Sequence, residues 1–267
     1  MTEHWTAEEI RAHWTAQATT HGTAPAASWS DLRVMEREVR EISQRLPATG
    51  TVLDVGCANG WSTLQFAAER AIDVKGVDYI PEMIDAAREQ LATVSSRLSG
   101  TAEFAVADAR DLRDEPALHY DAVVCIRVII NLGDWREQER GLRECVRVVK
   151  PGGLFLLSEA TLQGWRRLNA LRAEWGLDSI PMPSFNNYLD EDAVRETLAG
   201  DARLEEIVNF ASTYFVATRV LKPLLQAATA APLDPADPQS EWNRWAAELP
   251  AWGDYGTQKL FVFRRSE

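Results

Sequence analysis

Three acidic residues stand where apolar segments end, which is where side chains can meet a ligand at the edge of a sheet. Asp54 lies just before the turn Gly56-Cys57-Ala58-Asn59-Gly60, and Asp78 and Asp108 end the next two apolar segments. Glycines let the backbone approach a ligand closely. A carboxylate about 20 residues beyond such a turn can accept hydrogen bonds from both hydroxyls of a ribose. The pattern predicts a nucleoside site at the carboxyl ends of parallel strands.

The segments that must position these acids alternate between strand and helix patterns. Short apolar runs predict strands at Thr51–Val55, Asp73–Val77, Ala102–Val106, Tyr120–Ile126 and Leu154–Ser158, separated by helices at Ser62–Arg70, Pro81–Ser95 and Arg136–Val148. Continuous apolar strands are typical of a parallel sheet that is covered on both faces. The fold class is therefore α/β, with a doubly wound, Rossmann-like sheet.

The segments before residue 51 and after residue 160 lack this alternation of strands and helices. Helices are expected from Thr6 to Gln17 and from Ser30 to Leu46. After residue 160 we expect an irregular or helical stretch (161–188), helices at Asp190–Leu198, Thr218–Ala228 and Trp242–Ala247, an extended Arg203–Val216 and a last strand at Thr257–Phe263. The sequence thus divides into an N-terminal helical cover (1–50), a ligand-binding α/β core (51–160), and a cap insertion with closing strands (161–267).

Four motifs together resemble those of one enzyme family. Leu53-Asp54-Val55-Gly56-Cys57-Ala58-Asn59-Gly60, Gly76-Val77-Asp78, Ala107-Asp108-Ala109 and Val149-Lys150-Pro151-Gly152-Gly153 are similar in order and spacing to the class I S-adenosylmethionine-dependent methyltransferases over residues 50–160. That family often has glycine where Ala58 stands. The resemblance implies a seven-strand sheet closed by an antiparallel strand at Thr257–Phe263. More loosely, Gly22-Thr23, Trp29-Ser30-Asp31 and Tyr255–Lys259 resemble a bacterial subgroup often met in biosynthetic gene clusters.

The resemblance implies that S-adenosyl-L-methionine is the cofactor and indicates which residues hold it. They are Asp54, Gly56, Ala58, Gly60, Asp78, Tyr79, Met83, Asp108, Ala109 and Arg127. Tyr79 and Met83 would flank the adenine or ribose. Arg127 would hold the carboxylate of the cofactor or an acidic substrate, the alternative being an ion pair with a neighbouring helix.

The acceptor side of the site is expected just past the fourth strand and in the cap. Asn131 would orient a substrate or cofactor amine, the alternative being a helix or turn cap. Asn187, Tyr188 and Trp165 are expected to enter the site from the insertion. We further expect residues 161–188 and 218–252 to close over the substrate.

Net charge and the distribution of basic residues limit the classes of partner that this chain can bind. The net charge is −12. The basic runs are short, Arg166-Arg167 and Arg264-Arg265, and form no stripe for phosphate contacts, so we expect neither a nucleic-acid nor a membrane partner. No apolar run approaches the ~20 residues of a membrane span, and no secretory leader is evident. The three cysteines have no metal-ligand spacing, so we expect no metal site. They are also an odd set for a disulfide framework, which fits a reducing compartment, so we expect a cytoplasmic protein.

Three functions remain compatible with these residues. The first is methyl transfer to O, N or C of a small-molecule metabolite, because catalysis in such a site consists mostly of holding a nucleophile in line with the S–CH3 bond. The second is a cyclase of the azetidine-2-carboxylate synthase type, which closes S-adenosylmethionine on itself and releases methylthioadenosine. The third is a cofactor-binding partner subunit without turnover. The acceptor atom and the oligomeric state are left open.

Overall fold

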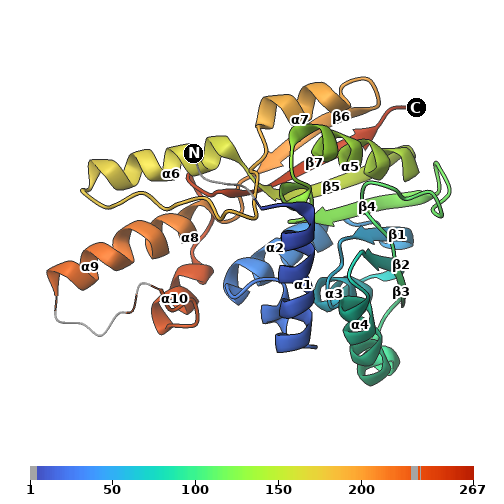
Figure 1. Cartoon of the computed structure of the whole chain (residues 1–267), viewed down its shortest axis with the longest axis horizontal. Coiled ribbons are helices and arrows are strands. Elements are labelled where there is room, and N and C mark those ends of the chain that lie inside the picture. Colours follow the sequence, from blue (N-terminus) through green and yellow to red (C-terminus); the bar gives the residue numbers. More distant parts are fainter. Residues whose placement is uncertain (1–4, 230–233, 235) are drawn as a thin grey trace.

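The computed structural model describes residues 5–229, 234 and 236–267. They form a sheet flanked by helices, with a helical lobe extending from one side (Figure 1). The seven strands are β1 (Thr49–Val55), β2 (Ala71–Asp78), β3 (Thr101–Val106), β4 (Tyr120–Ile126), β5 (Val149–Ala160), β6 (Ala202–Val208) and β7 (Gln258–Arg265). Their order is β3-β2-β1-β4-β5-β7-β6, with β7 antiparallel to both of its neighbours and the other pairs parallel. The expected doubly wound α/β fold is confirmed.

Ten α-helices accompany the sheet in the described residues. They are α1 (Ala7–His21), α2 (Leu32–Arg45), α3 (Trp61–Glu69), α4 (Pro81–Val94), α5 (Trp135–Val148), α6 (Leu162–Glu174), α7 (Glu191–Leu198), α8 (Ser212–Val216), α9 (Lys222–Ala228) and α10 (Glu241–Glu248). Short 3-10 turns lie at η1 (Pro25–Ala27), η2 (Ser95–Arg97) and η3 (Ile129–Asn131), and a π turn, η4 (Ala217–Leu221), joins α8 to α9. No helix in this part of the chain is both long and apolar enough to span a membrane.

The core lies on both faces of the sheet, which explains the uninterrupted apolar character of the central strands. On one face, Leu142 and Cys145 of α5 and Val194 of α7 pack against β4, β5 and β7. On the other, α2, α3 and the α8–α10 region pack against β1, β4 and β5. The sheet is therefore a rigid platform whose carboxyl-end edge is free to carry a site.

One expected element is wrong. Residues 203–216 were predicted as a single extended segment, but β6 ends at Val208 and α8 begins at Ser212. Phe210, Tyr214 and Phe215 are buried in the core beneath α2 and β7. A short apolar run satisfies either a buried strand or a buried helix, and here tertiary packing selects the helix.

Candidate active site

The turn after β1 is shaped by one glycine and one acid. Gly56 has φ +72°, and a Cβ added there would lie 2.0 Å from Cγ2 of Val128. The N–H groups of Gly56 and Cys57 both donate to the Val77 carbonyl, at 2.7 and 3.0 Å. The Ala58 N–H donates to Oδ2 of Asp78 at 3.0 Å, and Ala58 itself adopts φ +47°. The neighbouring strand thus fixes the turn, which accommodates alanine at position 58 with a positive φ.

The three acids predicted from the sequence sit at adjacent strand ends, in three different electrostatic settings. Burial raises the pKa of Asp54 to about 7, although the Thr63 hydroxyl donates to it at 2.6 Å. Burial also raises the pKa of Asp78 to about 6, against hydrogen bonds from the Ile80 and Ala58 N–H groups. Burial raises that of Asp108 as well, but hydrogen bonds from Arg110 outweigh it and hold the pKa below its usual range.

These residues line one cavity of about 390 Å³. Of the residues predicted from the sequence, the cavity is lined by Asp54, Gly56, Ala58, Asp78, Tyr79, Met83, Asp108, Ala109, Arg127, Asn131 and Tyr188. The structure therefore brings together residues from the ends of β1, β2, β3 and β4 and from the segment before α7. Among the described residues, no group of His, Cys, Asp and Glu side chains is arranged to hold a metal ion.

Three predicted residues lie elsewhere. Gly60 is the N-cap residue before α3, and a Cβ there would press on the Phe104 ring, so this glycine serves packing. The Trp165 indole N–H donates to the Ile180 carbonyl at 2.8 Å, which ties α6 to the segment that follows it. Asn187 does not line the cavity, and its side-chain amide donates to the carbonyl of the lining residue Gly133 at 2.9 Å. The expectation that Trp165 and Asn187 enter the site is therefore corrected.

Arg127 is held by protein partners on several sides. It forms a largely buried ion pair with Glu38 of α2, and its guanidinium lies 5.1 Å from the centroid of the Trp29 ring. Its backbone has φ +55°, and its N–H donates to the Ser158 carbonyl at 2.9 Å. Glu38 is 1% exposed and also accepts hydrogen bonds from Ser158 and Gln258. The ion pair with a neighbouring helix, one of the two readings of Arg127, is thus present, and the residue still lines the cavity.

A buried carboxylate that the sequence reasoning did not single out fixes the segment after β4. Oε1 of Glu159, in β5, accepts the N–H groups of Val128 and Ile129 at 2.8 and 2.7 Å. The side chain is fully buried, and this burial raises its pKa to about 8. Its Oε2 has no hydrogen-bond partner among the described residues. The sequence does carry a signal for this role, because Glu159 is a charged residue inside the apolar run Leu154–Ala160.

Two asparagines present unused acceptors in this region. The Asn131 amide donates to the Arg127 carbonyl at 2.8 Å, which leaves its Oδ1 buried and without a partner among the described residues. Oδ1 of Asn186 is likewise buried and unpartnered in the described part of the chain, and both residues line the cavity. A buried acceptor that lacks a donor carries a desolvation penalty of about 1–3 kcal/mol. Both atoms are therefore positioned to accept a hydrogen bond from a ligand.

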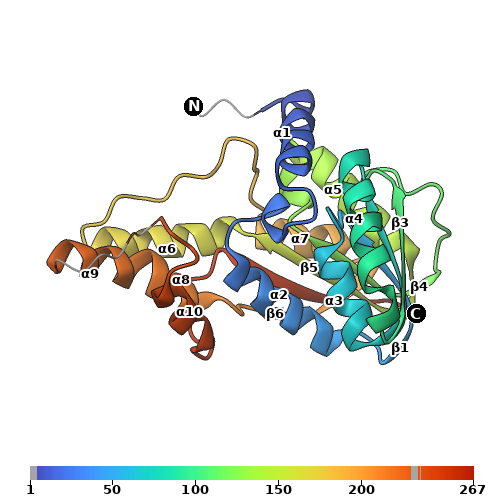
Figure 2. The ribbon, with the colours of Figure 1, turned by 90° about the horizontal axis from the view of Figure 1, so that it is seen from below.

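The cavity wall that faces the sheet edge differs from the expected one. It is built by Ile10 and Trp14 of α1, by Trp29, and by Pro183 and Phe185. Figure 2 shows the long segment between α6 and α7 running back toward α1. Trp14 and Phe185 meet edge to face at 6.0 Å between ring centroids. The described residues of 218–252 contribute nothing to the lining, so the expectation that they close over the cavity is wrong.

Comparison with known proteins agrees with this arrangement. A family model described as a methyltransferase domain matches residues 52–153. The ubiquinone biosynthesis O-methyltransferase of Xanthomonas axonopodis pv. citri is 33% identical over 118 residues, which is 44% of this chain and 46% of that one. O-methyltransferase rstn1 of Aspergillus nomiae is 30% identical over 129 residues, 48% of this chain and 55% of that one. The chain spans about half the length of these curated relatives.

Solved structures share the whole fold. Magnesium protoporphyrin IX methyltransferase (ChlM) from Synechocystis PCC 6803, solved with bound SAH, superposes with a TM-score of 0.58 at 17% identity, covering 88% of this chain and 86% of that one. A TehB-like SAM-dependent methyltransferase from Corynebacterium glutamicum gives 0.56 at 15% identity, covering 94% and 99%. At these identities the likeness establishes the fold. Residues 52–153 of the chain thus match a methyltransferase domain, and the chain has the fold seen in solved S-adenosylmethionine-dependent methyltransferases.

Proposed function

We propose that this chain binds S-adenosylmethionine and transfers its methyl group to a hydroxyl of a small metabolite with a largely apolar, ring-bearing body. The observation that carries the proposal is that one cavity joins Asp78 and the turn after β1 to an aromatic wall and to two amide oxygens that lack a partner among the described residues. The named O-methyltransferases among the relatives support oxygen as the acceptor atom.

The residues at the strand ends fit the cofactor. Asp78 is 8% exposed at the cavity, and each of its oxygens takes one backbone N–H, which leaves lone pairs for two ribose hydroxyls. Tyr79 and Met83 supply apolar surface for the adenine, and Asp108 can accept from the adenine amino group. Oδ1 of Asn131 offers an acceptor for the ammonium. The bound cofactor supplies an electrophilic methyl group on a sulfonium sulfur.

The aromatic half of the cavity fits the acceptor. Trp14, Trp29 and Phe185 form an apolar surface that excludes water and favours a ring. Burial raises the pKa of Tyr188 to about 12, so its phenol stays protonated at neutral pH and can orient the substrate by hydrogen bonding but cannot act as a base. Oδ1 of Asn186, which has no partner among the described residues, would accept a hydrogen bond from the substrate hydroxyl. These contacts hold the oxygen in place, which is the main requirement of methyl transfer.

Product analysis tests this proposal. Purified chain would be incubated with S-adenosylmethionine, with and without a panel of hydroxylated aromatic acceptors, and the products separated by chromatography. Adenosylhomocysteine that forms only with an acceptor, together with a methyl ether, is the expected result. Methylthioadenosine formed without an acceptor would establish the cyclase instead. Absence of both products while adenosylhomocysteine still binds would favour a subunit without turnover.

A further inference from the structure

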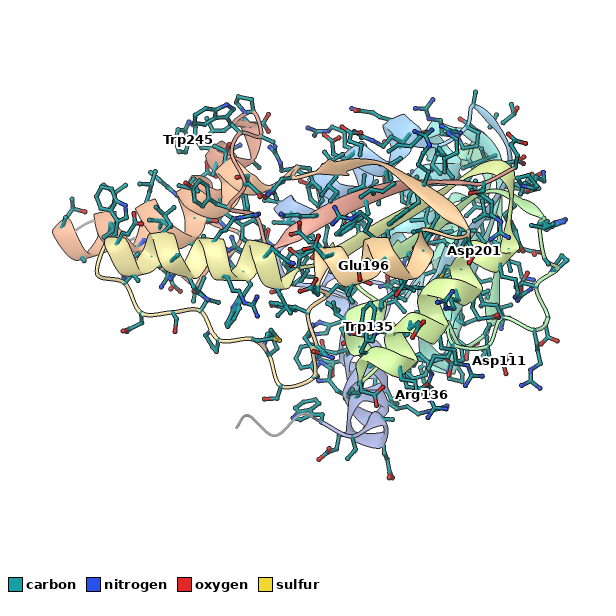
Figure 3. All side chains as sticks on the ribbon, turned by 90° about the horizontal axis from the view of Figure 1, so that it is seen from above. Asp111, Trp135, Arg136, Glu196, Asp201 and Trp245 are labelled. Atoms are coloured by element: carbon teal, nitrogen blue, oxygen red, sulfur yellow. The ribbon has the colours of Figure 1, made fainter. Side chains whose placement is uncertain are left out.

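Four arginines form a stripe along α5. Arg136, Arg140, Arg143 and Arg147 recur at intervals of four, three and four residues, which places them on one face of the helix. At 1.5 Å per residue the stripe is about 16 Å long. The expectation that no basic stripe exists, drawn from adjacent basic pairs, is therefore wrong. Figure 3 shows Arg136 beside Trp135 at the start of α5, with Asp111 on the segment that faces it.

The stripe is one wall of an open groove of about 560 Å³, separate from most of the cavity described above. Arg110 and Arg113, from the segment between β3 and β4, line the same groove. Six arginines and three carboxylates, Asp111, Glu139 and Glu144, therefore line it, for a formal charge of +3 on a chain whose net charge is −12. The groove is a cationic patch on an acidic protein.

Two of the arginines form no direct ion pair with another described residue. Arg143 pairs with Glu139 at 2.8 Å and Arg147 with Glu144 at 2.8 Å. Arg136 and Arg140 are exposed, and neither has an ion pair or side-chain hydrogen bond with another described residue. Guanidinium groups are suited to bidentate pairing with carboxylates. These two arginines lie one helical turn apart at the N-terminal end of the stripe, and the charge of Arg140 also acts on Asp108 and Asp111.

We propose that this groove docks an acidic protein partner through a helix whose carboxylates are spaced to match the α5 stripe. The three carboxylates in the groove would repel a continuous polyphosphate, whereas a protein surface can place acidic residues opposite the arginines and leave those carboxylates solvated. The net charge of −12 opposes nucleic acid over the rest of the surface. Because Arg110 lines both the groove and the cavity, the partner would sit beside the mouth of the active site.

A designed peptide tests the groove with the full chain. The probe is a fluorescent, alanine-rich helical peptide with glutamates at i, i+4, i+7 and i+11, and its binding is followed by fluorescence anisotropy. We expect saturable binding at about 50 mM salt that weakens strongly at about 300 mM, because screening acts on exposed charges. Arg136→Gln combined with Arg140→Gln should weaken binding about fivefold or more.

Matched controls make the result decisive. Arg195→Gln combined with Arg203→Gln removes two exposed arginines from α7 and β6 and should leave peptide affinity unchanged. Unfolding temperature establishes that both double variants are folded. No saturable binding of the peptide, equal loss in both double variants, or tighter binding of a single-stranded oligonucleotide of equal charge than of the peptide would each overturn the proposal.

Discussion

The buried carboxylate of Glu159 makes a quantitative prediction for the pH dependence of stability. The usual pKa of the group is 4.5, and burial raises it to about 8 in the folded chain. Between these values the folded state keeps a proton that the unfolded state has lost. The folded state then binds more protons, so the free energy of unfolding falls as pH rises. The loss is complete above the folded pKa and amounts to about 5 kcal/mol for this group alone.

Glu159→Gln removes this titration and keeps the geometry. The glutamine Oε1 can accept the same Val128 and Ile129 N–H groups, and its NH2 group takes the place of the unpartnered Oε2. The variant and the wild type should therefore have similar stability near pH 5. By pH 8 the variant should be more stable than the wild type by about 3–4 kcal/mol, because the folded-state carboxyl is then about half ionised.

Urea denaturation followed by tryptophan fluorescence at pH values from about 5 to 9 measures this difference. Glu196→Gln, which changes an exposed glutamate on α7, is the matched control and should track the wild type at every pH. If the gap between Glu159→Gln and wild type does not widen with pH, Glu159 is not a buried acid in the folded chain, and the reasoning fails.

Three further changes probe the cavity. Gly56→Ala should destabilise the fold by about 2–5 kcal/mol, because it combines positive φ with a methyl group pressed on Val128; Val128→Ala in the same chain should recover part of the loss in a denaturation cycle. Asp78→Ala should weaken adenosylhomocysteine binding by roughly 2–4 kcal/mol in calorimetric titration, since two charge-assisted hydrogen bonds are removed, and an unchanged affinity would refute the assignment. Asn186→Ala should reduce kcat/KM for the acceptor about tenfold or more while Asn187→Ala changes it little, and equal effects would contradict the assignment of the cavity face.

The sheet and the acidic half of the site were predictable because both depend on short, continuous stretches of sequence. β-Branched runs such as Tyr120–Ile126 define strands directly, and that strand has the predicted bounds. Asp54, Asp78 and Asp108 each lie at the end of such a run. Parallel strands place their carboxyl ends at one edge, so local sequence was enough to bring these three acids together.

The aromatic half could not be predicted, because its residues are placed by the path of irregular segments. Asn186 and Asn187 are adjacent, yet Asn186 lines the cavity and Asn187 does not, its side-chain amide donating to the Gly133 carbonyl. No periodicity distinguishes neighbours in a segment without regular structure. Trp14 comes from α1, far away in sequence, and reaches the wall because α1 packs on α4 and beside Phe185. Only tertiary structure provides that information.

The α5 stripe was predictable but was missed for a different reason. Its spacing of four, three and four residues is the same helical period that identifies an apolar face, and it lies inside a helix whose position was predicted almost correctly. The arginines of the stripe are three or four residues apart, so none of them is adjacent to another in the sequence. A helical period in charged residues indicates a surface as surely as one in apolar residues indicates a core.

The cavity has a part that hydrogen bonds and an ion pair hold in place and a part that lies on an irregular segment. Two buried carboxylates hold the segment 127–131, because Glu159 accepts two of its N–H groups and Glu38 holds the Arg127 guanidinium. That segment is anchored to β5 and α2 and has little freedom to adapt to a substrate. Phe185 and Asn186, by contrast, lie on an irregular segment. Changes there would reshape the acceptor end while leaving the strand-end acids in place, so substrate preference should reside in residues 183–188 and α1.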